Sequence, residues 1–160
     1  MEKDLILYIL CLTKDMPSMG RGKTVAHGAH AANLFTWNTV VTPLLNGNKP
    51  DEDVMEWHRM ANGFGTTVAL DVGDLENMVK VANAVATFDH FSGIVVDPTY
   101  PYLVDREIVK LIDPKVHTLD PVPSGPNMVC FREAQTCAYA FGEKELLKPI
   151  LSKFNLLSND

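Results

Sequence analysis

The feature that most constrains the fold is a short apolar segment followed by a glycine-containing turn and a helix of small residues. Leu5–Thr13 is rich in Ile, Leu and Tyr and predicts a buried strand. Lys14–Gly22 contains one proline and two glycines and predicts a turn, and Lys23–Trp37 predicts a helix. A strand, a turn and a helix in this order are typical of α/β proteins.

The rest of the chain continues this alternation. Two prolines and a glycine predict a loop over Thr42–Pro50. Apolar spacing and flanking residues predict further helices over Asp51–Asn62, Asp74–Phe88 and Glu143–Phe154. Strands are expected over Thr66–Asp71, Ser92–Val96, Met128–Phe131 and Thr136–Phe141. We therefore expect an α/β fold, a three-layer α/β/α sandwich around a mixed, mostly four-stranded sheet.

Composition limits the class of protein. A chain of 160 residues, 46% of them hydrophobic, is expected to form one domain over 1–160. No apolar run approaches the roughly 18 residues of a membrane span, and the N-terminus does not resemble a signal peptide. The three cysteines lie in apolar contexts, which favours a reduced, cytoplasmic protein. A net charge of −6 argues against broad nucleic-acid binding but leaves room for a local basic patch.

Two segments predict a functional site. Lys23, His27 and His30 fall on one stripe of the first expected helix, because residues three and four apart are neighbours. Small residues on the opposite side are expected to pack on the sheet, namely Val25, Gly28, Ala29 and Ala32. The third strand is expected to end at Asp97, so that Asp97–Pro101 forms a loop near the Gly20–Lys23 turn, since binding residues gather beyond the carboxyl ends of strands.

These residues allow several interpretations. Gly22-Lys23-Thr24 suggests a phosphate-binding P-loop, but the first glycine of that pattern is replaced by Pro17, which has no N–H to donate. His27, His30 and Asp97 could ligate a metal, although a histidine pair without a close third ligand is weak support. The simplest interpretation is that the histidines and Lys23 are surface residues of an ordinary helix.

The order of motifs resembles a known family. Met19-Gly20-Arg21-Gly22-Lys23 and His30-Ala31-Ala32 resemble the opening of the archaeal and eukaryotic type of peptidyl-tRNA hydrolase. Later segments fit the same family in the same order, namely Trp57, Thr67-Val68-Ala69-Leu70, Leu75–Val85, Ile94-Val95-Val96-Asp97 and Thr136 to Gly142.

The chain departs from that family in two places. The family usually has Asp-Ala-Gly-x-Thr-Gln where this chain has Asp97-Pro98-Thr99, so the threonine lies two residues after the aspartate and not four. The chain also has an insertion at about 102–135. It holds a short amphipathic piece, Val104–Ile112, followed by four prolines. A long loop of this kind is a lid, a binding loop or a tolerated insertion.

The resemblance implies hydrolysis of the ester between a peptide and the 3′ ribose of tRNA, without metal or cofactor. Lys23 would stabilise the oxyanion or hold the terminal phosphate, and Asp97 would accept a proton from water or orient it. Thr99 and His30 complete the expected catalytic set. The expected substrate-binding residues are Gly20, Arg21, Gly22, His27 and Thr136.

The implied partner is the acceptor end of peptidyl-tRNA, with no membrane. Either a monomer or a symmetric homodimer would suit the size of the chain. Two alternatives remain open at this point. One is a non-catalytic binding module on the same fold, and the other is a hydrolase of another small ester or amide.

Overall fold

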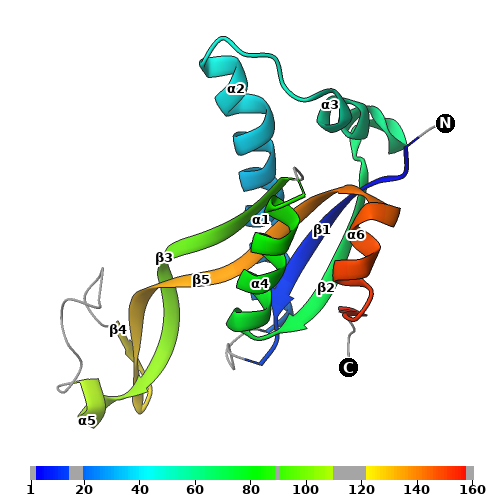
Figure 1. Cartoon of the computed structure of the whole chain (residues 1–160). Coiled ribbons are helices and arrows are strands. Elements are labelled where there is room, and N and C mark those ends of the chain that lie inside the picture. The colour runs from blue at the N-terminus through cyan, green and yellow to red at the C-terminus, as the bar shows by residue number, and fades with distance from the viewer. Residues whose placement is uncertain (1–2, 15–19, 89–90, 110–121, 158–160) are drawn as a thin grey trace. The chain divides into compact units, whose positions relative to one another are not determined.

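The computed structural model describes residues 3–14, 20–88, 91–109 and 122–157. They divide into two compact units: unit 1 comprises Met1–Val95 and Cys137–Asp160, and unit 2 comprises Val96–Thr136. The predicted insertion at 102–135 lies within unit 2. The helices and strands, in chain order, are β1 Leu5–Leu12, α1 Arg21–Thr36, the π-helix η1 Trp37–Val41, α2 Thr42–Leu45, α3 Glu52–Arg59, the 3₁₀-helix η2 Ala61–Gly63, β2 Thr66–Gly73, α4 Leu75–Ala86, β3 Phe91–Asp105, α5 Arg106–Val109, β4 Val122–Ser124, β5 Asn127–Glu143, α6 Lys144–Leu151 and β6 Asn155–Leu156 (Figure 1).

The expected α/β class and mixed sheet are confirmed. The strand order is β3-β5-β1-β2-β6, with β4 paired to β5. β1 runs parallel to β2 and antiparallel to β5, and β6 is antiparallel to β2. The sheet has six strands and not four, because the very short β4 and β6 also pair with it. Strands of two or three residues leave no periodicity that a sequence could reveal.

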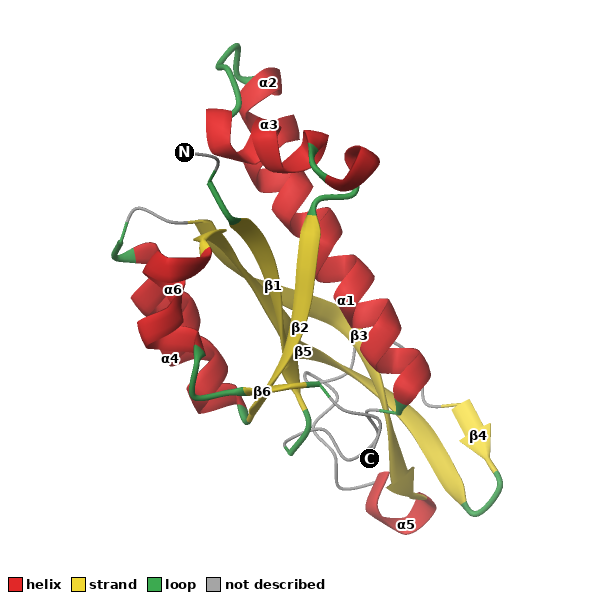
Figure 2. Ribbon diagram, turned by 90° about the vertical axis from the view of Figure 1, so that its right-hand side faces the viewer, coloured by secondary structure: helices red, strands yellow, loops and turns green. Residues whose placement is uncertain are grey.

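Helices of unit 1 lie on both faces of its sheet. Figure 2 shows α1 on one face and α4 with α6 on the other. All eight residues of β1 are buried, which explains why this strand is apolar throughout and does not alternate. Among the described residues, no helix is long and apolar enough to cross a membrane.

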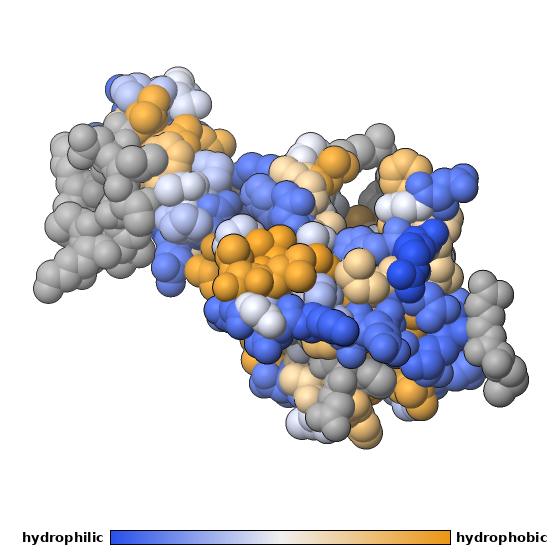
Figure 3. Space-filling view, turned by 90° about the horizontal axis from the view of Figure 1, so that it is seen from above, coloured by the Kyte–Doolittle hydropathy of each residue, from blue (hydrophilic) through white to orange (hydrophobic). Residues whose placement is uncertain are grey.

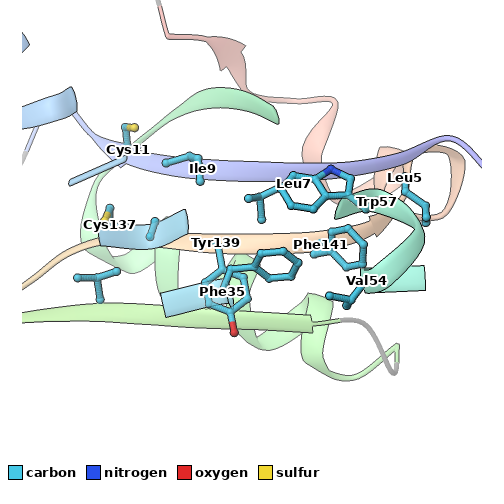
Figure 4. Packing of buried hydrophobic residues seen from close by; sticks show 12 residues of the cluster. Leu5, Leu7, Ile9, Cys11, Phe35, Val54, Trp57, Cys137, Tyr139 and Phe141 are labelled. Atoms are coloured by element: carbon cyan, nitrogen blue, oxygen red, sulfur yellow. The ribbon is translucent and has the colours of Figure 1, made fainter. Parts of the chain in front are cut away.

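An aromatic cluster forms the core between α1, α3 and the sheet (Figure 4). The ring of Phe35 lies 5.3 Å from Trp57, 5.4 Å from Tyr139 and 4.9 Å from Phe141, measured between centroids. Trp57 donates from Nε1 to the carbonyl oxygen of Thr66 at 2.8 Å, so its buried N–H has a partner. The cluster joins the start of β2 to both helices.

The first helix extends beyond its predicted end. Thr42–Pro50 was expected to be a loop, but Thr42–Leu45 is helical and continues from α1 through η1. Pro43 lacks an N–H and is the second residue of α2, directly after the π-helix, a position in the first turn of a helix that proline tolerates. The expectation of a loop is therefore wrong for its first half.

Other predicted boundaries differ by smaller amounts. Asp51 and Asp74 cap α3 and α4 by accepting hydrogen bonds from backbone N–H groups of the first turns. The last helix is shorter than expected and contains Pro149. The two strands expected over Met128–Phe131 and Thr136–Phe141 are one continuous strand, β5, which contributes residues to both units.

Unit 2 contains the outer parts of β3 and β5 together with α5 and β4. β4 pairs with β5 in an antiparallel hairpin, Ser124 opposite Asn127, with Gly125 at a φ of +58° in the turn. The guanidinium of Arg132 lies 5.1 Å from the ring centroid of Tyr102. The expected amphipathic piece Val104–Ile112 is divided between β3 and α5, and its last residues lie outside the described part of the chain.

Candidate functional site

The carboxyl ends of the parallel strands β1 and β2 are joined by a compact set of hydrogen bonds. The backbone N–H groups of Thr13 and Lys14 donate to the carbonyl oxygen of Gly73 at 3.1 and 2.8 Å. Asp71 accepts from the hydroxyl of Thr13 at 2.7 Å and from the N–H of Gly73 at 2.8 Å. The side chain of Lys14 lies over Gly73, where a Cβ atom would be 3.4 Å from its Cδ. This edge therefore places a carboxylate and a lysine close together.

Helix α1 begins at the same edge of the sheet (Figure 2). Gly20 is its N-cap, and a glycine has no side chain with which to cap the helix. Arg21 and Gly22 were expected to belong to the turn, but they form the first residues of the helix, and Lys23 follows in the same turn, half-buried. The first N–H groups of a helix have no partner within it and carry positive potential. Such a helix start suits an anionic or oxyanionic group.

The fold does not require glycine at Gly20 or Gly22. Gly20 has a φ of −77°, and a Cβ atom built at either position meets no atom of the described part of the chain within 4 Å. Glycine in a first helical turn weakens the helix relative to alanine. An open backbone at the start of α1 is thus an exposed surface that a ligand could approach closely.

The expected orientation of α1 is right for Gly28 and Ala32, which lie toward the core, but it is wrong for other residues. His27 is buried, whereas Val25, expected to face the sheet, is 74% exposed, and Ala29 is exposed as well. Phe35 sets the orientation, because its ring belongs to the aromatic core and steps of four residues place Ala31 and His27 on the same side.

His27 and His30 therefore differ in burial, and the expected exposed stripe of Lys23, His27 and His30 is interrupted at His27. His30 is exposed, and its ring lies 5.7 Å from that of His27 in an edge-on arrangement. The thiol of Cys137 on β5 donates to the carbonyl oxygen of His27 at 3.0 Å. His27 is thus part of the contact between α1 and the sheet, while His30 faces outward.

Asp97 and Thr99 lie in unit 2, and their expected loop is a strand. β3 does not end at Asp97 but runs on to Asp105. Pro98 and Pro101 are tolerated there because β3 is the last strand in the sheet order, where a missing N–H need not break a ladder. The carboxylate of Asp97 accepts from the backbone N–H of Thr99 at 2.8 Å and from its hydroxyl at 3.4 Å.

The candidate residues thus form two groups. Gly20, Arg21, Gly22, Lys23, His27 and His30 share one helix in unit 1. Asp97 and Thr99 contact each other in unit 2, and Thr136 is fully buried on β5 in the same unit.

Thr13 and Asp71 lie at the carboxyl ends of β1 and β2, and they were not predicted from the sequence as site residues. Asp71 is the last residue of the strand expected over Thr66–Asp71. The rule that drew attention to Asp97 at a strand end also applies to Asp71. Burial of the neighbouring Cys11 thiol, with a smaller contribution from the charge of Asp71, raises the pKa of that thiol to about 11. Cys11 therefore stays protonated near neutral pH and is a poor nucleophile.

Two other interpretations of this region were a metal site and a phosphate-binding P-loop. Among the described residues, no group of three His, Cys, Asp or Glu side chains could hold a metal ion. Pro17, on which the argument against a P-loop rested, lies outside the described residues, and Gly22-Lys23-Thr24 lies inside α1.

A pocket of about 390 Å³ lies at the other end of the α1–α2 helical stretch. Amide, hydroxyl and charged side chains line it together with Phe91 and Pro43: Asn38, Thr39, Thr42, Asn46, Asn48, Lys49 and Asp51. Along the helix axis, Asn38 lies about 22 Å from Lys23, at a rise of about 1.5 Å per residue. This pocket and the start of α1 are therefore separate features of unit 1.

Comparison with known proteins adds no assignment. No family model matches this chain, and no curated protein matches it.

Proposed function

We propose that this chain hydrolyses the ester that joins a peptide, or an N-blocked amino acid, to the 3′ ribose of tRNA. The observation that carries the proposal is the open glycine backbone at the start of α1. There a Cβ atom built at Gly20 or Gly22 would meet none of the described residues within 4 Å, and Lys23 lies in the same helical turn. The resemblance of Met19–Lys23 to the peptidyl-tRNA hydrolase opening agrees with that geometry. The proposal includes a three-layer α/β/α arrangement and a cytoplasmic location.

The proposed reaction needs water, a base and a donor for the developing negative charge. Water attacks the ester carbonyl and gives its proton to Asp97, or Asp97 orients it for attack. Lys23 stabilises the oxyanion or holds the terminal phosphate. The carbon–oxygen bond to the ribose then breaks, and the 3′ oxygen takes up a proton. The products are a free carboxylate and a tRNA 3′ hydroxyl.

Release of N-acetyl-amino acid from N-acetyl-aminoacyl-tRNA tests this proposal. Lys23→Ala and Asp97→Ala are each expected to lower the rate by about a hundredfold or more, with the circular dichroism of the fold unchanged. Equal turnover in the wild type and in both variants would exclude the two assigned roles. Turnover of free N-acetyl-amino acid esters at the same rate would indicate a hydrolase of smaller substrates.

The chain offers a matched control for each variant. Asp105 accepts the N–H of Glu107 at 2.8 Å, as Asp97 accepts that of Thr99, so Asp105→Ala removes the same local hydrogen bond. Lys148→Ala removes an exposed lysine on α6. Both control variants are expected to keep wild-type activity, because neither residue has a role in the proposed reaction.

A non-catalytic binding module is the second candidate function. It is favoured by the position of Asp97 within a strand, where its carboxylate already accepts hydrogen bonds from Thr99. This candidate predicts no ester hydrolysis at low salt, but binding of deacylated tRNA that weakens in Lys23→Ala. Direct binding and turnover measured on the same preparations separate the two functions.

A further inference from the structure

The pocket of about 390 Å³ at the far end of the α1–α2 stretch is shaped by backbone hydrogen bonds. After α2 the chain reverses at Gly47, whose φ is +73°. The N–H of Asn48 donates to the carbonyl oxygen of Pro43 at 2.9 Å. The N–H of Gly47 donates to the carbonyl oxygen of Leu44 at 3.1 Å. These bonds fold the segment after α2 back onto the helix and hold this wall of the pocket in place.

The polar side chains of this wall are available to a ligand. Within the described part of the chain, the side chains of Thr42, Asn46 and Asn48 make no hydrogen bond. The ammonium of Lys49 makes neither a hydrogen bond nor an ion pair with any described residue. In small-molecule sites a few polar groups of this kind fix the orientation of the ligand. The wall therefore has the donors and acceptors that a small polar ligand requires.

The helical side of the pocket is tied to the aromatic core. Asn38 and Thr39 belong to η1 and line the pocket. Nδ2 of Asn38 donates to the hydroxyl of Tyr139 at 3.2 Å, which leaves Oδ1 of the same amide as an acceptor. The hydroxyl of Thr39 donates to the carbonyl oxygen of Phe35 at 2.7 Å. Tyr139 and Phe35 both belong to the core, so this side of the pocket is already formed before a ligand arrives.

The pocket has two opposite charges that do not pair with each other. Lys49 and Asp51 are the charged residues of its lining, and no ion pair joins them. As the N-cap of α3, Oδ1 of Asp51 accepts the backbone N–H groups of Asp53 and Val54 at 2.9 and 3.3 Å. Its second oxygen has no hydrogen-bond partner among the described residues. An ammonium and a carboxylate beside one small cavity are complementary to a ligand that carries both charges.

The lining also has an apolar part, to which Phe91 and Pro43 contribute. Seen from the side on which α2 lies, the surface has hydrophobic residues directly beside hydrophilic ones (Figure 3). A ligand bound in the pocket therefore meets apolar as well as charged groups.

We propose that this pocket binds a free α-amino acid with an apolar side chain, as its zwitterion. The ammonium of the ligand pairs with Asp51 and donates to Oδ1 of Asn38, and its carboxylate pairs with Lys49. The side chain of the ligand packs against Phe91 and Pro43. A volume of about 390 Å³ lies at the lower end of the range for ligand sites, which suits a molecule of this size.

Other classes of small ligand leave a charge of the pocket without a partner. A mononucleotide brings negative charge, which Lys49 attracts and Asp51 repels, and an amine reverses that pattern. A neutral sugar leaves both charges partly desolvated and unpaired, which is costly. The proposal is independent of the proposed hydrolysis, because the pocket does not include the start of α1.

Titration calorimetry with L-phenylalanine and L-leucine tests the proposal. The N-acetyl and the amide derivative of each amino acid lack one of the two charges. We expect an amino acid to bind and both of its derivatives to bind about tenfold or more weakly, because one charge of the pocket then has no counter-charge. Failure of both amino acids to bind would overturn the proposal. Equal affinity for the derivatives, or tighter binding of adenosine monophosphate, would also overturn it.

Two substitutions remove the charges one at a time. Asp51→Asn keeps an N-cap for α3, because asparagine caps helices as well as aspartate does. It is expected to weaken binding of the amino acid about tenfold and to leave binding of the N-acetyl derivative unchanged. Lys49→Met is expected to weaken binding of the amino acid to a similar extent and to leave binding of the amide derivative unchanged. A purely structural effect would not match each variant to one derivative.

Asp74→Asn and Lys148→Met are the matched controls. Asp74 is the N-cap of α4 and accepts the N–H of Asn77 at 2.9 Å, and Lys148 is exposed on α6. Neither residue lines the pocket, so both variants are expected to bind the amino acid as the wild type does. Equal weakening in the controls, or wild-type affinity in Asp51→Asn and Lys49→Met, would contradict the assignment. Thermal melts of each variant confirm that the compared proteins are folded.

Discussion

At the scale of single residues, the core depends on where a side chain is missing as much as on where one is present. Gly65 ends the turn before β2 with a φ of +67°, a conformation that residues with a Cβ rarely adopt. A Cβ atom there would lie 2.1 Å from Cε2 of Trp57. The indole thus occupies the space that a side chain at Gly65 would need, and the turn and the aromatic cluster depend on each other.

Gly65→Ala is therefore expected to be strongly destabilising. It combines a left-handed backbone with overpacking against a buried ring, for a loss of about 3 kcal/mol or more in the free energy of unfolding. Gly47→Ala is the comparison, because Gly47 has a φ of +73° and nothing within 4 Å of a built Cβ. It is expected to cost about 1 kcal/mol. Urea unfolding of both variants measures the difference, and equal losses would show that Trp57 can move aside.

At the scale of elements, the start of α1 combines low helix propensity with an open backbone. Gly22 and Gly28 both lie inside this helix, but their surroundings differ. A Cβ atom at Gly22 would meet nothing within 4 Å, and one at Gly28 would make an ordinary contact of 4.0 Å with Ile9. Neither glycine is needed for packing, so any need for Gly22 has to come from a ligand.

Gly22→Ala is expected to stabilise the fold by about 0.5–1 kcal/mol, because alanine is the better helix former. Under the proposed function it is also expected to slow hydrolysis of N-acetyl-aminoacyl-tRNA about tenfold or more, by displacing substrate from the helix start. Gly28→Ala is expected to stabilise the helix similarly and to keep full activity. If Gly22→Ala turned over substrate normally, the open backbone would have no part in catalysis.

The same elements show what could be predicted from the sequence. β1 and α4 were placed to within about two residues, because a continuous apolar run and a clear helical period are strong local signals. The helices expected to begin at Asp51 and Asp74 begin one residue later, because both aspartates are N-caps and not the first helical residues.

The errors arose where distant residues decide the structure. The orientation of α1 depends on the fit of Phe35 among rings from α3 and β5, and a helical wheel of small residues carries too little signal to reveal it. The continuation of β3 through Pro98 and Pro101 depends on its place at the end of the sheet order, which local propensity does not encode. This difference bears on the candidate site, because the sequence argument for Asp97 depends on a strand that ends at this residue.

At the scale of the whole molecule, the aromatic core belongs to unit 1 alone. Every buried residue of the cluster around Phe35 and Trp57 lies within Met1–Val95 or Cys137–Asp160. β3 and β5 approach each other closely in this unit, since a Cβ atom at Gly93 would lie 2.6 Å from the ring of Tyr139. Unit 1 thus contains the contacts that a cooperative fold requires, while Asp97, Thr99 and Thr136 belong to unit 2.

Replacing Val96–Thr136 by an Asn-Gly turn is therefore expected to leave a folded protein. Asn-Gly favours the two-residue hairpin that would join Val95 to Cys137 on neighbouring strands. Near-ultraviolet circular dichroism, which reports the packing of Trp57, is expected to persist with a cooperative thermal transition. Hydrolysis is expected to be lost, because the shortened chain keeps Lys23 but lacks Asp97.

A shortened chain that unfolds without cooperativity would mean that unit 2 contributes to the core. Activity that survives would mean that the base of the proposed reaction lies in unit 1, where Asp71 is the carboxylate beside Thr13.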